Sequence, residues 1–237
     1  MFRNFGVGVL ALALAACGVP KARQGGPQHS HEPLRPADLQ LPGKIYRVDA
    51  GQSELRVLVY RAGPLARLGH NHVVVNRALR GTAALAEGAW AFQLTVPVAG
   101  FAVDDAQARS EEGPDFAADV PDGAKSGTLQ NMLGAAVLDA DEFPVITVDS
   151  VAVTGAQGAP DSASMIATVS ISVAGHESTV QVPFTLQSES SRLSAAGSLG
   201  LRQSDLGLTP YSLMLGALQV QDQMTIKFKI VAVPGQP

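Results

Sequence analysis

Apolar residues recur at every second position over much of the chain between Lys44 and Val233, and this alternation limits what the chain can fold into. The clearest case is MTIKFKI at residues 224–230, in which polar residues separate the apolar ones. Successive side chains of a β-strand project to opposite faces of a sheet, so such segments predict strands with one apolar and one polar face. Glycine-containing turns separate the segments, for example at 87–88 and 175–176. The pattern predicts an all-β domain of antiparallel strands.

One segment departs from the alternation and shows helical spacing instead. Its apolar residues recur at i, i+3, i+4, i+7 and i+8, namely Leu129, Met132, Leu133, Ala136 and Val137. Ser126 or Thr128 could cap the start of this helix. A single short amphipathic helix beside a long series of strands predicts a lid or plug on a closed sheet, because closure removes exposed strand edges.

Composition argues against two classes of function. The 237 residues carry a net charge of −4 without a cluster of basic residues, whereas nucleic-acid binding requires clustered Lys and Arg against the phosphates. The chain has no G-x-S-x-G motif, and its adjacent acidic pairs at 104–105 and 111–112 lie in a polar segment where carboxylates are usually solvated. We therefore expect a binding protein and not an enzyme.

The first 17 residues, MFRNFGVGVLALALAAC, have the features of an export signal. Arg3 precedes an apolar run that is too short to span a bilayer as a helix. Leu14-Ala15-Ala16-Cys17 resembles the lipobox of bacterial lipoproteins, which implies cleavage before Cys17 and acylation of this single cysteine. We predict a signal peptide at residues 1–16. The alternative is an ordinary secretory signal in which the cysteine is accidental.

Residues 17–43 are predicted to form the acylated cysteine and a flexible tether, because this stretch contains Gly-Gly-Pro and few apolar residues. Two or more acyl chains hold a protein stably on a membrane. Gly18 stands where an Asp would resemble an inner-membrane retention signal. We therefore expect a protein of the bacterial envelope, lipid-anchored in the outer membrane and facing the periplasm, with residues 44–233 as its folded domain.

Four short motifs follow one another along this domain: YRVDAGQS at 46–53, LDADEFPVIT at 138–147, VAGH at 173–176 and LRQSDLG at 201–207. Together with the last strand they resemble the motifs of the YceI family of lipocalin-like, polyisoprenoid-binding proteins, over most of residues 44–233. The resemblance implies an antiparallel eight-stranded barrel that holds a long apolar molecule, such as a polyisoprenoid, a quinone or a fatty-acid derivative. Gln52 departs from the family, which usually has a histidine there.

In such a barrel, one face of each alternating segment lines the interior. We predict that a ligand contacts the apolar residues on that face, which are Leu55, Val57, Val59, Phe92, Leu94, Val96, Val169, Ile171, Val182, Phe184, Ile226 and Phe228. Eight strands enclose an interior that is either filled by side chains or wide enough for one ligand. A structural envelope module with a filled barrel is therefore an alternative to a lipid carrier.

The histidines of the domain suggest a further alternative. His70 and His72 are two residues apart, so on a strand both imidazoles project to one face and could reach the same divalent metal ion. His176 is the remaining domain histidine and a candidate third ligand, besides the acidic pairs at 104–105 and 111–112. This interpretation predicts a metal-binding protein or a metal-dependent enzyme. The competing interpretation is that the histidines form hydrogen bonds at the barrel rim or with a ligand headgroup.

Overall fold

The computed structural model describes residues 44–235, apart from 87–88, 156–161 and 190. The predicted signal peptide at 1–16, the predicted acylation site Cys17 and the predicted tether lie outside the described residues. Within the described part of the chain, no helix combines the length and the apolar character needed to cross a membrane.

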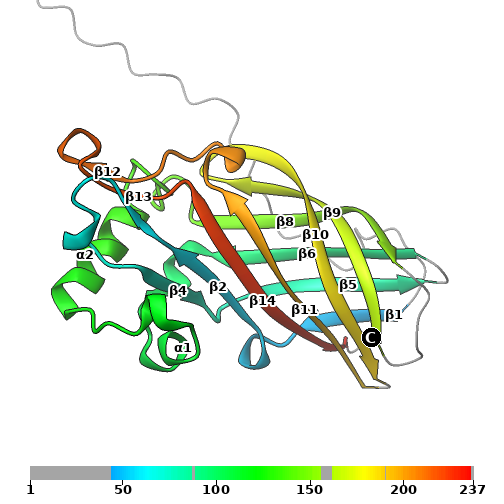
Figure 1. Cartoon of the computed structure of the whole chain (residues 1–237). Coiled ribbons are helices and arrows are strands. Elements are labelled where there is room, and N and C mark those ends of the chain that lie inside the picture. Colours follow the sequence, from blue (N-terminus) through cyan, green and yellow to red (C-terminus); the bar gives the residue numbers. More distant parts are fainter. Residues whose placement is uncertain (1–43, 87–88, 156–161, 190, 236–237) are drawn as a thin grey trace, which may run out of the picture. The chain divides into compact units, whose positions relative to one another are not determined.

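The strands form a closed, antiparallel, eight-stranded barrel in which each strand pairs with its neighbours in the chain (Figure 1). The predicted fold class is confirmed. Five strands of the barrel are continuous: β8 (Val145–Gly155), β9 (Ser162–Val173), β10 (His176–Glu189), β11 (Arg192–Arg202) and β14 (Gln223–Pro234). The other three are each broken into two segments: β1 (Lys44–Val48) with β2 (Glu54–Val59), β4 (His72–Asn76) with β5 (Arg80–Ala86), and β6 (Ala89–Pro97) with β7 (Phe101–Val103).

Strand β14 closes the barrel. One of its edges pairs with β11, and its other edge pairs first with β2 and then with β1. Phe228 lies opposite Leu55 in β2, and Val233 lies opposite Arg47 in β1. Because the last strand returns to the first, both edges of β14 are paired, and closure of this kind removes strand edges that could recruit another chain.

The three broken strands bend side by side, and Asn76 supports the bend. Its side chain is fully buried. Its amide group donates to the carbonyl oxygen of Pro97 at 2.8 Å, and its Oδ1 accepts from the backbone N–H of Ala78 at 2.9 Å. Asn76 thereby satisfies backbone groups that the interrupted ladder leaves unpaired, as buried polar groups require.

The predicted helix exists, but its boundaries differ from the predicted ones. Helix α2 spans Asp122–Leu133 and follows Pro121, which provides no side-chain cap. The capping prediction was wrong, since Ser126 and Thr128 lie inside the helix. The helix ends because Gly134 adopts an extended conformation, so the predicted apolar positions Ala136 and Val137 lie in the turn that follows.

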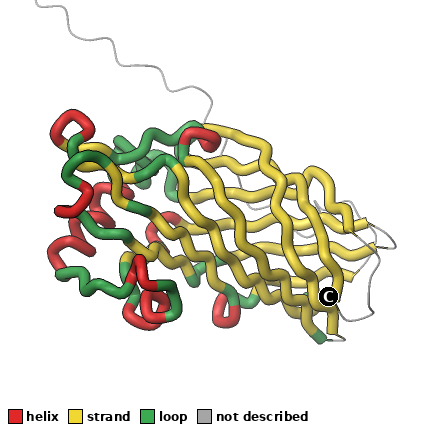
Figure 2. Tube along the Cα trace, in the orientation of Figure 1, coloured by secondary structure: helices red, strands yellow, loops and turns green. Residues whose placement is uncertain are grey.

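Shorter elements complete the domain. Helix α1 spans Ala106–Ser110, and its first turn is capped by the carboxylate of Asp105, which accepts from the backbone N–H of Ala108. A small sheet has the order β12 (Ser212–Leu213), β13 (Leu218–Val220), β3 (Arg61–Ala62). Single 3₁₀ turns are η1 (Ala50–Gln52), η2 (Ala66–Leu68), η3 (Val98–Gly100), η4 (Pro114–Phe116), η5 (Ser204–Leu206) and η6 (Met214–Gly216). Both α-helices and the small sheet lie at the same end of the barrel (Figures 1 and 2).

The segment that contains α1 and η4 covers part of the outer wall. Leu58, Val73 and Val75 point away from the barrel interior and are buried together with Ala108 and Phe116. This cover explains why the outward-facing residues of β4 are apolar and why all five of its residues are buried, since a strand that is covered on both sides needs no solvent-exposed face.

Candidate ligand cavity

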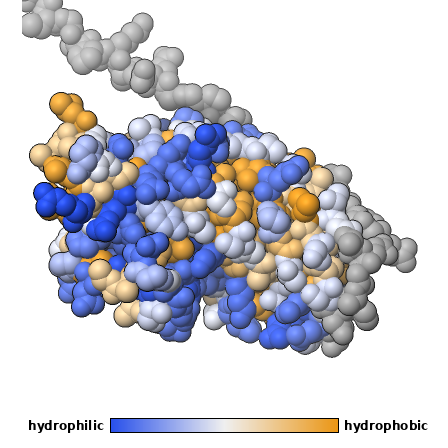
Figure 3. All heavy atoms as spheres, in the orientation of Figure 1, coloured by the Kyte–Doolittle hydropathy of each residue, from blue (hydrophilic) through white to orange (hydrophobic). Residues whose placement is uncertain are grey.

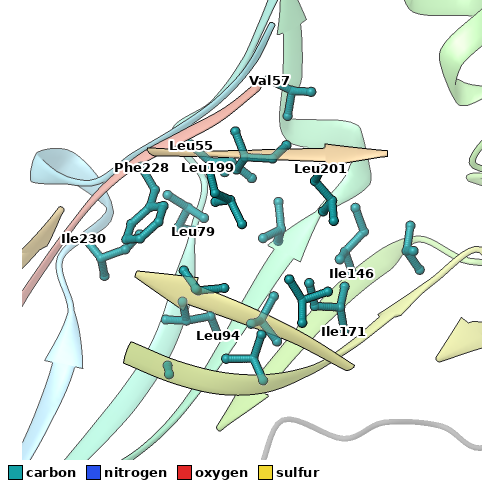
Figure 4. Close-up of a pocket in the computed structure, with 18 of the residues that line it drawn as sticks. Leu55, Val57, Leu79, Leu94, Ile146, Ile171, Leu199, Leu201, Phe228 and Ile230 are labelled. Carbon is teal, nitrogen blue, oxygen red and sulfur yellow. The ribbon is translucent and has the colours of Figure 1, made fainter. Parts of the chain in front are cut away.

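A cavity of about 330 Å³ lies inside the barrel. Every residue that the sequence alternation predicted as lining, from Leu55 in β2 to Phe228 in β14, lies on its wall. In the close-up, Leu55, Leu94, Ile171 and Phe228 approach the same space from different strands (Figure 4). The structure thus places the predicted residues together, and their contact with a ligand stays a prediction.

The wall of the cavity is almost entirely apolar. Of the described residues that form it, only Thr82 and Gln203 have polar side chains, and none is charged. The Gln203 amide is already used, because it donates to the carbonyl oxygen of Gln221 at 2.7 Å. An ordered water needs two to four polar partners, which this wall does not supply. The site is therefore suited to hydrocarbon, and a volume near 330 Å³ lies at the lower end of the range for small-molecule pockets.

The sequence alternation identified only part of this wall. Leu199, Leu201 and Ile230 also line the cavity, and the same period of two would have found them. Met132 and Val137 belong to the segment with helical spacing, which the sequence predicted as a lid or plug. Other lining residues stand outside the regular elements and have no periodic signal: Leu79, Leu138, Leu206 and Leu208. These positions could not be identified before the path of the chain around the barrel was known.

Two groups of side chains occupy the two ends of the barrel. At the end where α2 lies, Met132, Val137 and Leu138 reach the cavity, and Leu129 and Leu133 pack against the same core. At the other end, Tyr46, Leu186 and Leu193 are buried in a separate cluster with Trp90 beside them. Helix α2 thus contributes to closing one end, in the position expected of a lid or plug.

Three of the sequence motifs meet close to the α2 end. Ala174 and Gly175 both have positive φ, as a two-residue hairpin turn between β9 and β10 requires. A Cβ atom at Gly175 would lie 2.8 Å from Cζ of Phe143, and one at Gly207 would lie 2.5 Å from Cγ of His176. Only glycine permits these two contacts, so the motifs at 138–147, 173–176 and 201–207 act as one packed unit.

Comparison with known protein families shows to which family the chain belongs. The family model described as the YceI-like domain matches residues 46–232, which is most of the chain. The chain belongs to the YceI-like family. The predicted resemblance is therefore confirmed. The match begins two residues after the start of β1 and ends two residues before the end of β14, so it covers the whole barrel of this YceI-like domain.

Two solved structures share the fold of this YceI-like domain. BcnA of Burkholderia cenocepacia is 19% identical with a TM-score of 0.56, and the match covers 78% of this chain and 99% of BcnA. A polyisoprenoid-binding domain from Saccharophagus degradans is 12% identical with a TM-score of 0.55, and the match covers 80% of this chain and 98% of that domain. At these identities the likeness shows the fold alone. A comparison with curated proteins found no match.

The histidines of the YceI-like domain do not assemble into a metal site. His72 is buried, with Nδ1 2.7 Å from Oδ2 of Asp104 and Nε2 3.1 Å from Oγ1 of Thr128. The rings of His70 and His72 are 6.0 Å apart between centroids, and His176 packs against Gly207. Among the described residues, no three His, Cys, Asp or Glu side chains form a group that could hold a metal ion. The structure therefore supplies no third ligand to the predicted pair.

The carboxylates near His72 are less solvated than the sequence predicted. Asp104 is 3% exposed, and its Oδ1 accepts from Nη1 of Arg109 at 2.6 Å and from the backbone N–H of Val73 at 2.9 Å. Burial alone would raise the pKa of Asp104, but the hydrogen bonds from His72 and Val73 and the charges of His72 and Arg109 outweigh burial and lower it. Asp104 therefore forms the centre of a charged network beneath α1 and α2.

Glu112 forms a second network on the outer wall. Its carboxylate accepts from Nζ of Lys227 at 2.5 Å and from Nη1 of Arg56 at 3.3 Å. Arg56 also pairs with Glu54 and Glu111. These pairs fix the covering segment to β2 and β14. Asp104, Asp105, Glu111 and Glu112 therefore join the covering segment to the barrel wall, and none of them lines the cavity.

Proposed function

We propose that this protein binds a long apolar molecule inside its barrel and sequesters or carries it without catalysis. The observation that carries the proposal is the apolar cavity of about 330 Å³, whose described wall has no charged side chain. A ligand with a hydrocarbon tail gains roughly 0.8 kcal/mol for each methylene group that it buries there. The Saccharophagus degradans domain, which shares this fold and is described as polyisoprenoid-binding, supports the same class of ligand.

The proposed ligand is a polyisoprenoid, a quinone or a fatty-acid derivative. These molecules share a long hydrocarbon chain, which is the part that an apolar wall can recognise. The two polar lining residues, Thr82 and Gln203, are too few to select a polar molecule by hydrogen bonding. An apolar wall of this kind selects ligands by the length and width of their hydrocarbon chain.

The proposed location is the bacterial envelope, with the protein anchored to a membrane by acyl chains on Cys17. The support for this part is the lipobox-like Leu14-Ala15-Ala16-Cys17 and the preceding apolar run. An anchored carrier would stay close to the membrane in which its ligand dissolves.

The test is native mass spectrometry of the protein purified from its own host, followed by extraction and identification of the bound lipid. We expect the purified protein to carry a mass that is released by organic solvent and identified as a long-chain lipid. Protein that never carries such a mass, and that does not take up polyisoprenoid, quinone or fatty acid when these are supplied, would refute the proposal.

A further inference from the structure

Four exposed apolar side chains gather at one projecting corner of the domain. Leu68 in η2 is 62% exposed, and Leu213, Met214 and Leu215 are 44%, 72% and 108% exposed. Consecutive exposed apolar residues of this kind are unfavourable on a surface that faces only water. We call these four residues the apolar tip. Figure 3 shows apolar residues concentrated at the corner where Figure 1 places β12.

The framework beneath the apolar tip is well hydrogen-bonded. Strand β13 pairs with β12 on one side and with β3 on the other. The backbone N–H of Leu65 donates to the carbonyl oxygen of Ala217 at 2.8 Å, which joins η2 to the same sheet. A Cβ atom at Gly63 would lie 2.6 Å from the carbonyl oxygens of both Gly216 and Ala217, so the two backbones are in close contact. The apolar tip is therefore presented by an ordered scaffold.

The backbone at the end of the apolar tip is strained. Met214 and Leu215 have φ values of 50° and 56°, in the left-handed region that favours glycine. Each such residue costs about 1–2 kcal/mol. Strain of this size persists where the surrounding structure imposes it, and it clusters at functional positions. In this loop the strained conformation directs the side chains of Met214 and Leu215 into solvent. Glycine at either position would adopt the same backbone conformation without strain.

The charged side chains on the two segments that build the apolar tip are basic. The two chain segments that build it, residues 61–69 and 211–220, contain Arg61 and Arg67 and no acidic residue. Both arginines are exposed, and Arg67 is adjacent to Leu68 in η2. Exposed apolar side chains next to exposed guanidinium groups suit a membrane surface, which has acyl chains inside and anionic phosphates outside.

We propose that the apolar tip docks on an anionic phospholipid bilayer. A second copy of this chain is a poorer partner, because a two-fold contact between tips would bring Arg61 and Arg67 towards their counterparts. The apolar tip also lies near the cavity, since Leu208 lines the cavity and β12 begins at Ser212. Docking would place the α2 end of the barrel close to the bilayer. This inference goes beyond the proposed function and does not require the barrel to hold a lipid.

The test uses the full chain with Cys17→Ser, which removes the predicted acyl anchor, and compares it with the same chain carrying Leu213→Ser, Met214→Ser and Leu215→Ser. Both proteins keep the same N-terminal segment, so that segment contributes equally to both. Binding is measured by flotation with vesicles of phosphatidylcholine, with and without phosphatidylglycerol. We expect the triple variant to bind anionic vesicles about tenfold more weakly or worse. Arg67→Gln is expected to reduce the preference for phosphatidylglycerol.

A second measurement locates the contact without relying on the triple variant. In the Cys17→Ser background, Met214→Cys and Val151→Cys are each labelled with an environment-sensitive fluorophore. Val151 is a matched control, because it is also apolar and is 65% exposed but lies on β8. We expect anionic vesicles to shift the emission of the label at position 214 to shorter wavelength and to leave the label at 151 unchanged.

Results of three kinds would overturn the proposal. The first is equal vesicle binding by the parent and the triple variant. The second is an unshifted label at position 214, or equal binding to vesicles with and without phosphatidylglycerol. The third is concentration-dependent dimerisation that the triple variant abolishes, since this would make a second copy the occupant. None of these results depends on the lipid content of the barrel, so failure here is distinct from failure of the proposed function.

Discussion

Nε2 of His72 lies 3.1 Å from Oγ1 of Thr128, and this contact joins helix α2 to strand β4 of the barrel wall. The other ring nitrogen, Nδ1, lies 2.7 Å from Oδ2 of Asp104, so the imidazole links α2 to the buried carboxylate. The helix itself is weak, since Gly123 and Gly127 lie inside it and no side chain caps its start. Its position over the end of the barrel therefore depends on tertiary contacts.

Thr128→Val is expected to loosen α2 while leaving the barrel folded. The substitution keeps the shape of the side chain but leaves Nε2 of the half-buried pair without its partner, which costs about 1 kcal/mol. Hydrogen exchange should become faster for the backbone amides of α2 and stay unchanged in β9 and β10. Ser126→Ala is the matched control, because the Ser126 hydroxyl donates only to the carbonyl oxygen of Asp122 within the same helix. Identical exchange in α2 for both variants would show that the contact with His72 does not hold the helix.

Asp104→Asn is expected to lower the free energy of unfolding by about 3–5 kcal/mol, because it leaves the mostly buried Arg109 guanidinium without its carboxylate. The control is Asp205→Asn. Asp205 pairs with Arg202 at 2.9 Å, but both side chains are exposed, so the loss should be much smaller than for Asp104→Asn. Denaturant unfolding of both variants measures the difference. Equal losses would mean that burial of the Asp104 pair adds nothing to stability.

The acid sensitivity of the fold should also depend on Asp104. Its pKa is lowered in the folded protein from the ordinary value of 3.8, so the ionised form is favoured by folding. This contribution is fully present above pH 3.8 and is lost as the pH falls through the lowered folded value. The unfolding free energy of Asp104→Asn should therefore fall less steeply with decreasing pH than that of the unaltered protein. Parallel pH profiles would contradict this role of Asp104.

Val148→Phe is expected to weaken binding of an apolar ligand, because Val148 lines the cavity and a larger ring would occupy part of its volume. A loss of about 1–3 kcal/mol in binding free energy corresponds to a decrease in affinity of roughly 5- to 150-fold. Val151→Phe is the matched control on the same strand, since Val151 is 65% exposed on the outer face. Lipid content by native mass spectrometry should fall only for Val148→Phe. An equal fall in both variants would point to a general effect on folding.

Cys17→Ser is expected to move the protein from the membrane fraction to a fraction released without detergent, because the predicted acyl chains attach to this single cysteine. The unaltered protein should also have the additional mass of its acyl chains after the first 16 residues are removed. Arg23→Gln, in the predicted tether, serves as a control that leaves the export signal and the cysteine unchanged. Unchanged fractionation and an unmodified mass would show that Cys17 is not an anchor.

The wall of the barrel could be predicted from the sequence because strand alternation is a local property. Residues such as Leu55, Val57 and Val59 share a face whatever the rest of the chain does, and each lies on the cavity wall in the structure. The alternation did not say which face was inside. The family motifs indicated the closed eight-stranded arrangement, and the pairing of β14 with both β1 and β2 confirmed it.

The tertiary structure decided what covers the barrel. His72 and Asp104 are 32 residues apart, and nothing near either one in the sequence shows that they are buried together. The burial of Asp104 and the apolar outer face of β4 both follow from the fold-back of the segment that contains α1. Helix α2 likewise ended at Gly134, where the chain turns back, and not where its apolar spacing ended. Periodicity predicts which side chains of a segment share one face, because that depends only on local backbone geometry. Burial of the other face depends on which distant segment covers it, and the local pattern does not contain this information.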